Sequence, residues 1–312
     1  VKACRVHDLM HDFILKKCEE FNFCQVKKAI GNFLHLKYLS LRGSNIKTIP
    51  KSIGNLQNLE TLDLKLTNVT DLPVEVYSLT KLCYLNVLTK EWNGVKLEKG
   101  VGNLTALQKL AILDASDEGG DIVGELKKLK QLSCLKIENV GEKDGISLCN
   151  AIESMTNLRS LHIGSKDNEI LELESLSSPP PHLERLYLYG SCSHVQKVPD
   201  WVFRLKNLIS LELDRFKLRQ DQLCLIGHHL PELILLASRS FKGDELNIKK
   251  GWFGKLKSLL LTASSVKTIT IDEGSLPSLQ QFHLELNLDP KVVEVPDHVR
   301  ELMVMDLYGE DN

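Results

Sequence analysis

An apolar phrase of the form leucine-x-x-leucine-x-leucine recurs from Leu36 almost to the end of the 312-residue chain. Its first leucine returns every 23 to 26 residues, with no long interruption. Apolar residues fill nearly every anchor position of the phrase. The anchor triplets are Leu36/Leu39/Leu41, Leu59/Leu62/Leu64, Leu82/Leu85/Val87, Leu107/Leu110/Ile112, Leu132/Leu135/Ile137, Leu158/Leu161/Ile163, Leu183/Leu186/Leu188, Leu208/Leu211/Leu213, Leu233/Leu236/Ser238, Leu256/Leu259/Leu261, Leu279/Phe282/Leu284 and Leu302/Met305/Leu307.

This phrase constrains the fold because alternating anchors place their side chains on one face of a short strand. One repeat cannot cover that apolar face by itself, so neighbouring repeats must stack on one another. The period is that of a leucine-rich repeat. We therefore predict an α/β leucine-rich-repeat solenoid of about twelve repeats, curved like a horseshoe, with a parallel sheet on its concave face.

The segments that return from one strand to the next carry a proline signature. An apolar residue and a proline, as in Ile49-Pro50, Leu72-Pro73 and Val198-Pro199, are followed by apolar residues three apart. Proline ends an extended run because it lacks a backbone donor. We expect a short 3₁₀ or α turn after each of these prolines.

The first residues do not follow the repeat. Residues 5–23 carry apolar side chains at spacings of three and four, which predicts a helix. We assign residues 1–24 to the end of a preceding helical region and residues 25–312 to the repeat domain.

Composition excludes several classes of function. A net charge of −2 gives no reason to expect nucleic acid as a partner. The sequence has no transmembrane run and no apolar segment near its start that would act as a signal peptide. The eight cysteines lack the spacing of a zinc site, which favours free thiols and a cytoplasmic location. Two glycosylation triplets, beginning at Asn68 and Asn103, argue for the opposite location.

Three segments resemble plant intracellular disease-resistance receptors of the coiled-coil nucleotide-binding leucine-rich-repeat class, especially those of grasses. They are residues 36–42 (LKYLSLR), residues 46–64 (IKTIPKSIGNLQNLETLDL) and Val6-His7-Asp8. The last is similar to the MHD motif that closes the nucleotide-binding region in that family, with valine in place of methionine.

The resemblance implies a sensing and autoinhibitory region. In the family, the solenoid recognises a pathogen effector or a guarded host protein, and it packs on the receptor's own nucleotide-binding module to restrain it. ADP or ATP binds to that module in the intact family member, where the histidine matching His7 touches the nucleotide. The present chain has no phosphate-binding G-x-x-x-x-G-K-[ST] loop, so we expect no cofactor in it.

The exposed strand positions supply the best candidate binding residues. Counting from the anchors, Arg185, Tyr187 and Tyr189 lie beside Glu212 and Asp214. Tyrosine and arginine dominate interaction hot spots because they bury a large area with few rotatable bonds. The alternative is that these side chains only solvate the sheet.

No arrangement of residues predicts catalysis or metal binding. The adjacent His228 and His229 would point in opposite directions on an extended segment, and no third ligand lies near them. We predict that the chain is not an enzyme. Two other functions remain open: an extracellular ligand-binding ectodomain and a non-functional truncated gene product.

Overall fold

The computed structural model describes residues 30–91, 94–96, 98–116, 122–191, 196–263, 265–287 and 290–307. The helix predicted over residues 5–23, the boundary at residue 24 and His7 lie outside the described residues. The chain divides into two compact units. One comprises the residues up to Val140 with Asp144–Leu158, and the other comprises Gly141–Lys143 and the residues from Arg159 onward.

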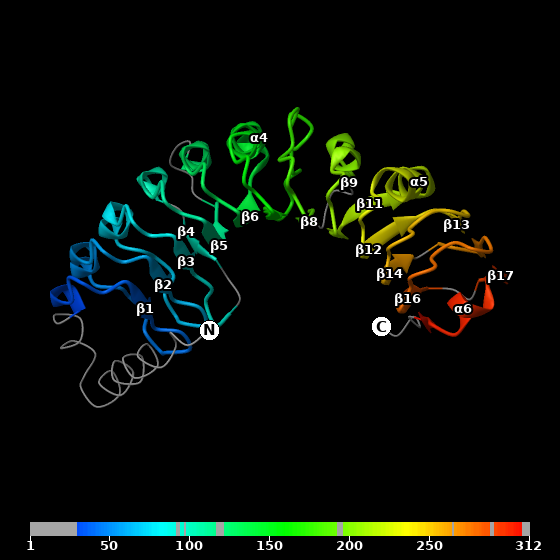
Figure 1. The fold of residues 1–312 in the computed structure, drawn as a ribbon, viewed down its shortest axis with the longest axis horizontal. Coiled ribbons are helices and arrows are strands. Elements are labelled where there is room, and N and C mark those ends of the chain that lie inside the picture. The colour runs from blue at the N-terminus through cyan, green and yellow to red at the C-terminus, as the bar shows by residue number, and fades with distance from the viewer. Residues whose placement is uncertain are drawn as a thin grey trace. The chain divides into compact units, whose positions relative to one another are not determined.

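In the first unit, short parallel strands stack in chain order and helical turns lie on the opposite side (Figure 1). Its strands are β1 (Tyr38–Ser40), β2 (Thr61–Asp63), β3 (Tyr84–Asn86), β5 (Lys109–Asp114) and β6 (Cys134–Val140), with β4 (Val95–Lys96) paired to β5. Its helical turns are η1 (Ile30–Asn32), η2 (Lys51–Asn55), η3 (Val74–Ser78), η4 (Val101–Asn103), α3 (Ile122–Glu125), η5 (Leu126–Lys128) and α4 (Gly145–Glu153), the last preceded by η6 (Glu142–Asp144).

The second unit repeats this plan with longer strands and a second sheet. Its main sheet contains β7 (Ser160–Ser165), β8 (Arg185–Tyr189), β10 (Ser210–Asp214), β12 (Leu235–Lys242), β14 (Ser258–Ala263), β16 (Gln281–Leu286) and β18 (Met303–Leu307). The return segments contain β9 (Gln196–Lys197), η7 (Asp200–Arg204), β11 (Phe216–Arg219), α5 (Gln220–His229) and α6 (Asp297–Arg300). They also supply the three-stranded sheet of β13 (Glu245–Ile248), β15 (Thr268–Ile271) and β17 (Val292–Glu294).

The leucine anchors form the core of each unit, as the repeat predicts. The middle anchor of each of the first eleven repeats is at most 1% exposed. Apolar residues of the helical turns, such as Ile53, Val76, Ile152 and Val202, are buried as deeply. The core therefore lies between the main sheet and the return segments, and the other face of the sheet is left for binding.

The proline signature also predicts local structure correctly. Pro50, Pro73 and Pro199 each adopt extended backbone angles and directly precede the 3₁₀ turns η2, η3 and η7. Because proline fixes its own φ and donates no hydrogen bond, the strand-side conformation ends there and the turn begins.

Two anchor assignments are wrong. In the fourth repeat the buried third anchor is Leu113, because Ile112 adopts a φ of 57° in a bulge of β5 and the ladder to β6 resumes at Leu113. In the last repeat Met303, not Met305, lies opposite Phe282. Helix α6 ends at Arg300, so β18 can begin at Met303. The residues opposite β16 are therefore two positions earlier in the chain than predicted.

Candidate functional site

The candidate binding residues of the sequence analysis lie side by side on two neighbouring strands. Strand β8 pairs in parallel with β10, so that Tyr187 lies opposite Glu212 and Tyr189 opposite Asp214. Both strands present these residues on the face that the leucines do not occupy, because side chains alternate along a strand. The register therefore brings the five residues together on two neighbouring strands.

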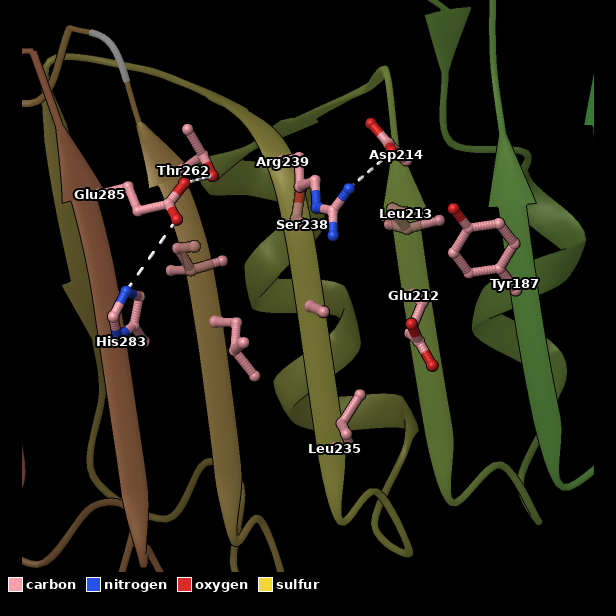
Figure 2. A pocket seen from close by; sticks show the side chains of 13 residues that line it. Tyr187, Glu212, Leu213, Asp214, Leu235, Ser238, Arg239, Thr262, His283 and Glu285 are labelled. Carbon is pink, nitrogen blue, oxygen red and sulfur yellow. Dashed lines mark hydrogen bonds and ion pairs between the residues drawn. The ribbon is translucent and has the colours of Figure 1, made fainter. Parts of the chain in front are cut away.

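Tyr187, Glu212 and Asp214 line an open hollow of about 200 Å³ on the main sheet of the second unit (Figure 2). The hollow extends from β8 to β16 and includes β10, β12 and β14. Arg185 and Tyr189 do not line it. We call this feature the tyrosine hollow.

The middle of the tyrosine hollow is apolar. Leu235, Ala237 and Leu260 supply side chains from β12 and β14. Leu260 is 39% exposed although it is a large aliphatic residue on a strand. An exposed leucine that lies between an alanine and a histidine of the neighbouring strands offers apolar area to a partner rather than to the core.

Charged side chains surround this apolar centre. Arg239 Nη1 lies 3.3 Å from Asp214 Oδ2 on one side, as Figure 2 shows. On the other side, the Thr262 hydroxyl donates a hydrogen bond of 2.6 Å to Glu285. The Glu212 side chain makes no hydrogen bond or ion pair within the described part of the chain, so its carboxylate is available to a partner.

A histidine continues this acidic side toward the last strand. His283 Nε2 lies 2.9 Å from Asp306 Oδ2 and 3.9 Å from Glu285 Oε1. The two carboxylates outnumber this one imidazole. The tyrosine hollow is therefore acidic overall, with Arg239 as its one full cation among the lining residues.

Aromatic contacts hold the tyrosines in place. Tyr187 stacks on His162 of β7, with ring centroids 4.2 Å apart and planes at 22°. The guanidinium of Arg215 lies 4.5 Å from the centre of the Tyr189 ring, a cation–π distance. A ring that is already fixed loses little side-chain entropy when a partner covers it.

The predicted cluster contains only three of the thirteen residues that line the tyrosine hollow. Arg239, Leu260 and His283 belong to it, yet the predicted cluster ends at β10. The repeat phrase itself contains the signal, since these residues occupy the same exposed positions one to three repeats beyond β10. The count of exposed positions reaches His283 in the eleventh repeat but leaves it out of the predicted cluster, and counting through the ninth and tenth repeats would have added Arg239 and Leu260.

The described residues contain no group of three or more histidine, cysteine, aspartate or glutamate side chains placed to hold a metal ion. His228 and His229 lie in α5 and not on the extended segment that we expected, because the return segment here is long enough for a helix. Trp252 Nε1 donates a hydrogen bond of 3.1 Å to His228 Nε2.

Cys83, Cys134, Cys149 and Cys224 are not joined in disulfide bonds. No helix among the described residues is both long and apolar enough to cross a membrane.

Parallel strands at a regular 23 to 26 residue interval, backed by helical turns, define a leucine-rich-repeat protein. Residues 2–305 match the family described as a leucine-rich repeat region, and the chain belongs to this family.

Curated relatives are plant disease-resistance proteins. The chain is 27% identical to disease resistance protein RPM1 of Arabidopsis thaliana over 226 residues, which are 70% of this chain and 24% of that protein. It is also 27% identical to disease resistance protein Pik-2 of Oryza sativa subsp. japonica over 236 residues, covering 66% and 23% of the two chains. The chain thus spans about a quarter of the length of these relatives.

Solved structures share the fold. The plant peptide hormone receptor RGFR1, solved in complex with RGF2, has a TM-score of 0.60 and 23% identity, with 91% of this chain and 45% of that chain covered. A leucine-rich-repeat protein of Leptospira interrogans has a TM-score of 0.55 and 24% identity, with 90% and 74% covered.

Proposed function

We propose that this chain is the sensing region of a plant disease-resistance receptor and that the tyrosine hollow binds a protein partner, either a pathogen effector or a guarded host protein. The observation that carries the proposal is the exposed apolar centre of Leu235, Ala237 and Leu260 beside the fixed ring of Tyr187. Residues of this kind, surrounded by charged groups, form the energetic centre of protein interfaces.

The charges around the tyrosine hollow indicate which partner would bind. Among the described residues no cation forms an ion pair with Glu212, and Glu285 and Asp306 share one histidine. A lysine or arginine on the partner would pair with these carboxylates while an adjacent apolar side chain covers Leu260. Complementary charge of this sort raises the association rate and selects the partner.

Display of secreted pathogen proteins and host proteins on yeast, panned against the purified chain, tests the proposal. We expect binders whose affinity falls at least tenfold when Tyr187→Ala is introduced, because truncating a central aromatic residue costs about 2 kcal/mol or more.

Tyr84→Ala is the matched control, since Tyr84 is a strand tyrosine of the first unit that is 41% exposed. The proposal fails if no binder is found at micromolar concentration. It also fails if the binders respond to Tyr84→Ala as strongly as to Tyr187→Ala.

The relatives and the free thiols support a cytoplasmic location for the receptor, with the receptor's own nucleotide-binding module as an intramolecular partner. Titration of the denatured, unreduced protein with a thiol reagent tests the location. Eight reactive groups are expected from the eight cysteines of the sequence, and a value near zero would favour the extracellular alternative.

A further inference from the structure

A second hollow, of about 180 Å³, lies on the sheet of the first unit. Ten residues line it, from the region of β1 to β6. The tyrosine hollow and the proposed protein recognition do not involve it. We call it the lysine hollow because Lys65, Lys109 and Lys136 lie on its wall.

The lysine hollow is strongly positive. Arg42 adds a fourth cation, and Asp63 is its only acidic residue among the lining residues. Asp63 is 8% exposed and already engaged, because its Oδ1 accepts a hydrogen bond of 3.0 Å from the Lys65 backbone N–H and its Oδ2 lies 4.0 Å from Arg42 Nη1. The hollow therefore has an excess of three positive charges.

The three ammonium groups have no anionic partner in the part of the chain that the structure describes. No ion pair or side-chain hydrogen bond is formed by Lys65, Lys109 or Lys136. Other lysine side chains of the same unit do form such contacts. Lys37 forms an ion pair of 2.7 Å with Glu60, and Lys81 donates a hydrogen bond of 2.8 Å to Asn58. Like charges held close together repel one another, and an anion bound among them removes that cost.

All three lysines are half-buried, which strengthens their field relative to fully exposed charges. Apolar Val87 and Leu88 supply part of the wall. Ammonium groups act as point charges on phosphate oxygens.

The wall also contains the bulge of β5. Ile112 lines the lysine hollow with a φ of 57°, a conformation that is rare for a β-branched residue. The bulge interrupts the ladder to β6 between Leu110 and Leu113, directly beside Lys109 and near Lys136. Bulges re-aim neighbouring side chains and occur often at binding sites.

We propose that the lysine hollow binds a small, free, multiply charged anion of the phosphate class. The volume holds one or two phosphate-sized groups, and only an anion with several charges in so small a space balances an excess of three. Separate carboxylates on a peptide would need more room for the same charge.

Isothermal titration of the full chain with sodium tripolyphosphate tests the proposal, with sodium sulfate at matched ionic strength as the reference anion. We expect saturable binding that weakens as NaCl is added, because salt screens these charges. The double variant Lys109→Gln/Lys136→Gln should bind about a hundredfold more weakly, at roughly tenfold for each charged hydrogen bond lost.

Lys37→Gln/Lys81→Gln is the matched control, since it removes the same charge from the same unit outside the lysine hollow. It should bind as the unaltered chain does. Lys65→Gln provides a second, independent variant if the double variant does not fold, and about tenfold weaker binding is expected from it.

Three results would overturn the assignment. They are the absence of saturable tripolyphosphate binding, an equal loss in the control variant, and tighter binding of a phosphoserine peptide than of tripolyphosphate. The last would mean that the natural ligand is carried by a protein and is not a free anion.

Discussion

Ser238 occupies a core position where the neighbouring repeats place leucine, and its replacement by alanine should stabilise the protein. Its side chain is 1% exposed and lies opposite the anchors Leu213 and Leu261. The hydroxyl oxygen has no hydrogen-bond partner among the described residues. A buried hydroxyl without a partner costs about 1–3 kcal/mol in stability.

The change Ser238→Ala removes this hydroxyl and keeps the β carbon, so it creates almost no cavity. We expect the free energy of unfolding to rise by about 1–2 kcal/mol. Ser275→Ala is the control, in which the free energy of unfolding should fall. Ser275 is equally buried, but its hydroxyl donates a hydrogen bond to the Asp272 carbonyl, and losing that bond should cost about 1 kcal/mol.

Native-state hydrogen exchange suits this comparison because repeat proteins open locally and do not always unfold in a single step. Peptides from β12 and β14 should exchange about five- to thirtyfold more slowly in Ser238→Ala, as 1–2 kcal/mol requires. Faster exchange in Ser238→Ala would refute the reasoning, since the Ser238 hydroxyl would then have a hydrogen-bond partner. Slower exchange in Ser275→Ala would also refute it, since the Ser275 hydrogen bond would then not stabilise the protein.

Three further predictions follow from burial and backbone geometry. Leu186→Ala should destabilise the protein by about 2–5 kcal/mol in urea denaturation, because Leu186 is only 1% exposed. Met305→Ala should cost under about 1 kcal/mol, because Met305 is 41% exposed. Equal losses of stability in the two variants would contradict the assignment of the core. Burial raises the pKa of Tyr77 from 10 to about 12. The unfolded chain therefore loses this proton first, stability falls between pH 10 and 12, and Tyr77→Phe should remove that part of the fall; an unchanged slope in alkaline unfolding would contradict the raised pKa. Gly227→Ala should lower the thermal midpoint although alanine favours helices by about 1 kcal/mol, because its β carbon would lie 2.9 Å from the Trp252 ring; a raised midpoint would mean that the ring can move.

The repeat phrase predicts one strand of the main sheet in each repeat, although β18 is shifted by two residues, because burial of the anchors leaves little freedom. The anchor residues of a repeat lie on one face of its strand, and that face is the one that packs in the core. The phrase does not predict the buried anchor correctly where the backbone forms a bulge and the neighbouring residues are equally apolar. Ile112 and Leu113 are equally apolar, and only the bulge decides which of them is buried.

In the candidate site, the sequence predicts which residues are neighbours but not which side chains pair. The sequence placed Tyr187 beside Glu212 correctly, because strands that stack in register bring equivalent positions together. The positional count did not show that Arg239 pairs with Asp214 across the strands. Such pairs depend on side-chain lengths and rotamers, which a positional count does not contain.

The amino-acid sequence alone determined the period, the fold class and the resemblance to disease-resistance proteins, because these follow from apolar residues repeated at fixed spacing. Only the tertiary structure decided which exposed positions converge on a hollow and which charges remain without a partner. Lys65, Lys109 and Lys136 are separated by 44 and 27 residues in the chain, and stacking of the repeats brings them to one wall. Local periodicity fixes each repeat, whereas binding surfaces arise from contacts between repeats.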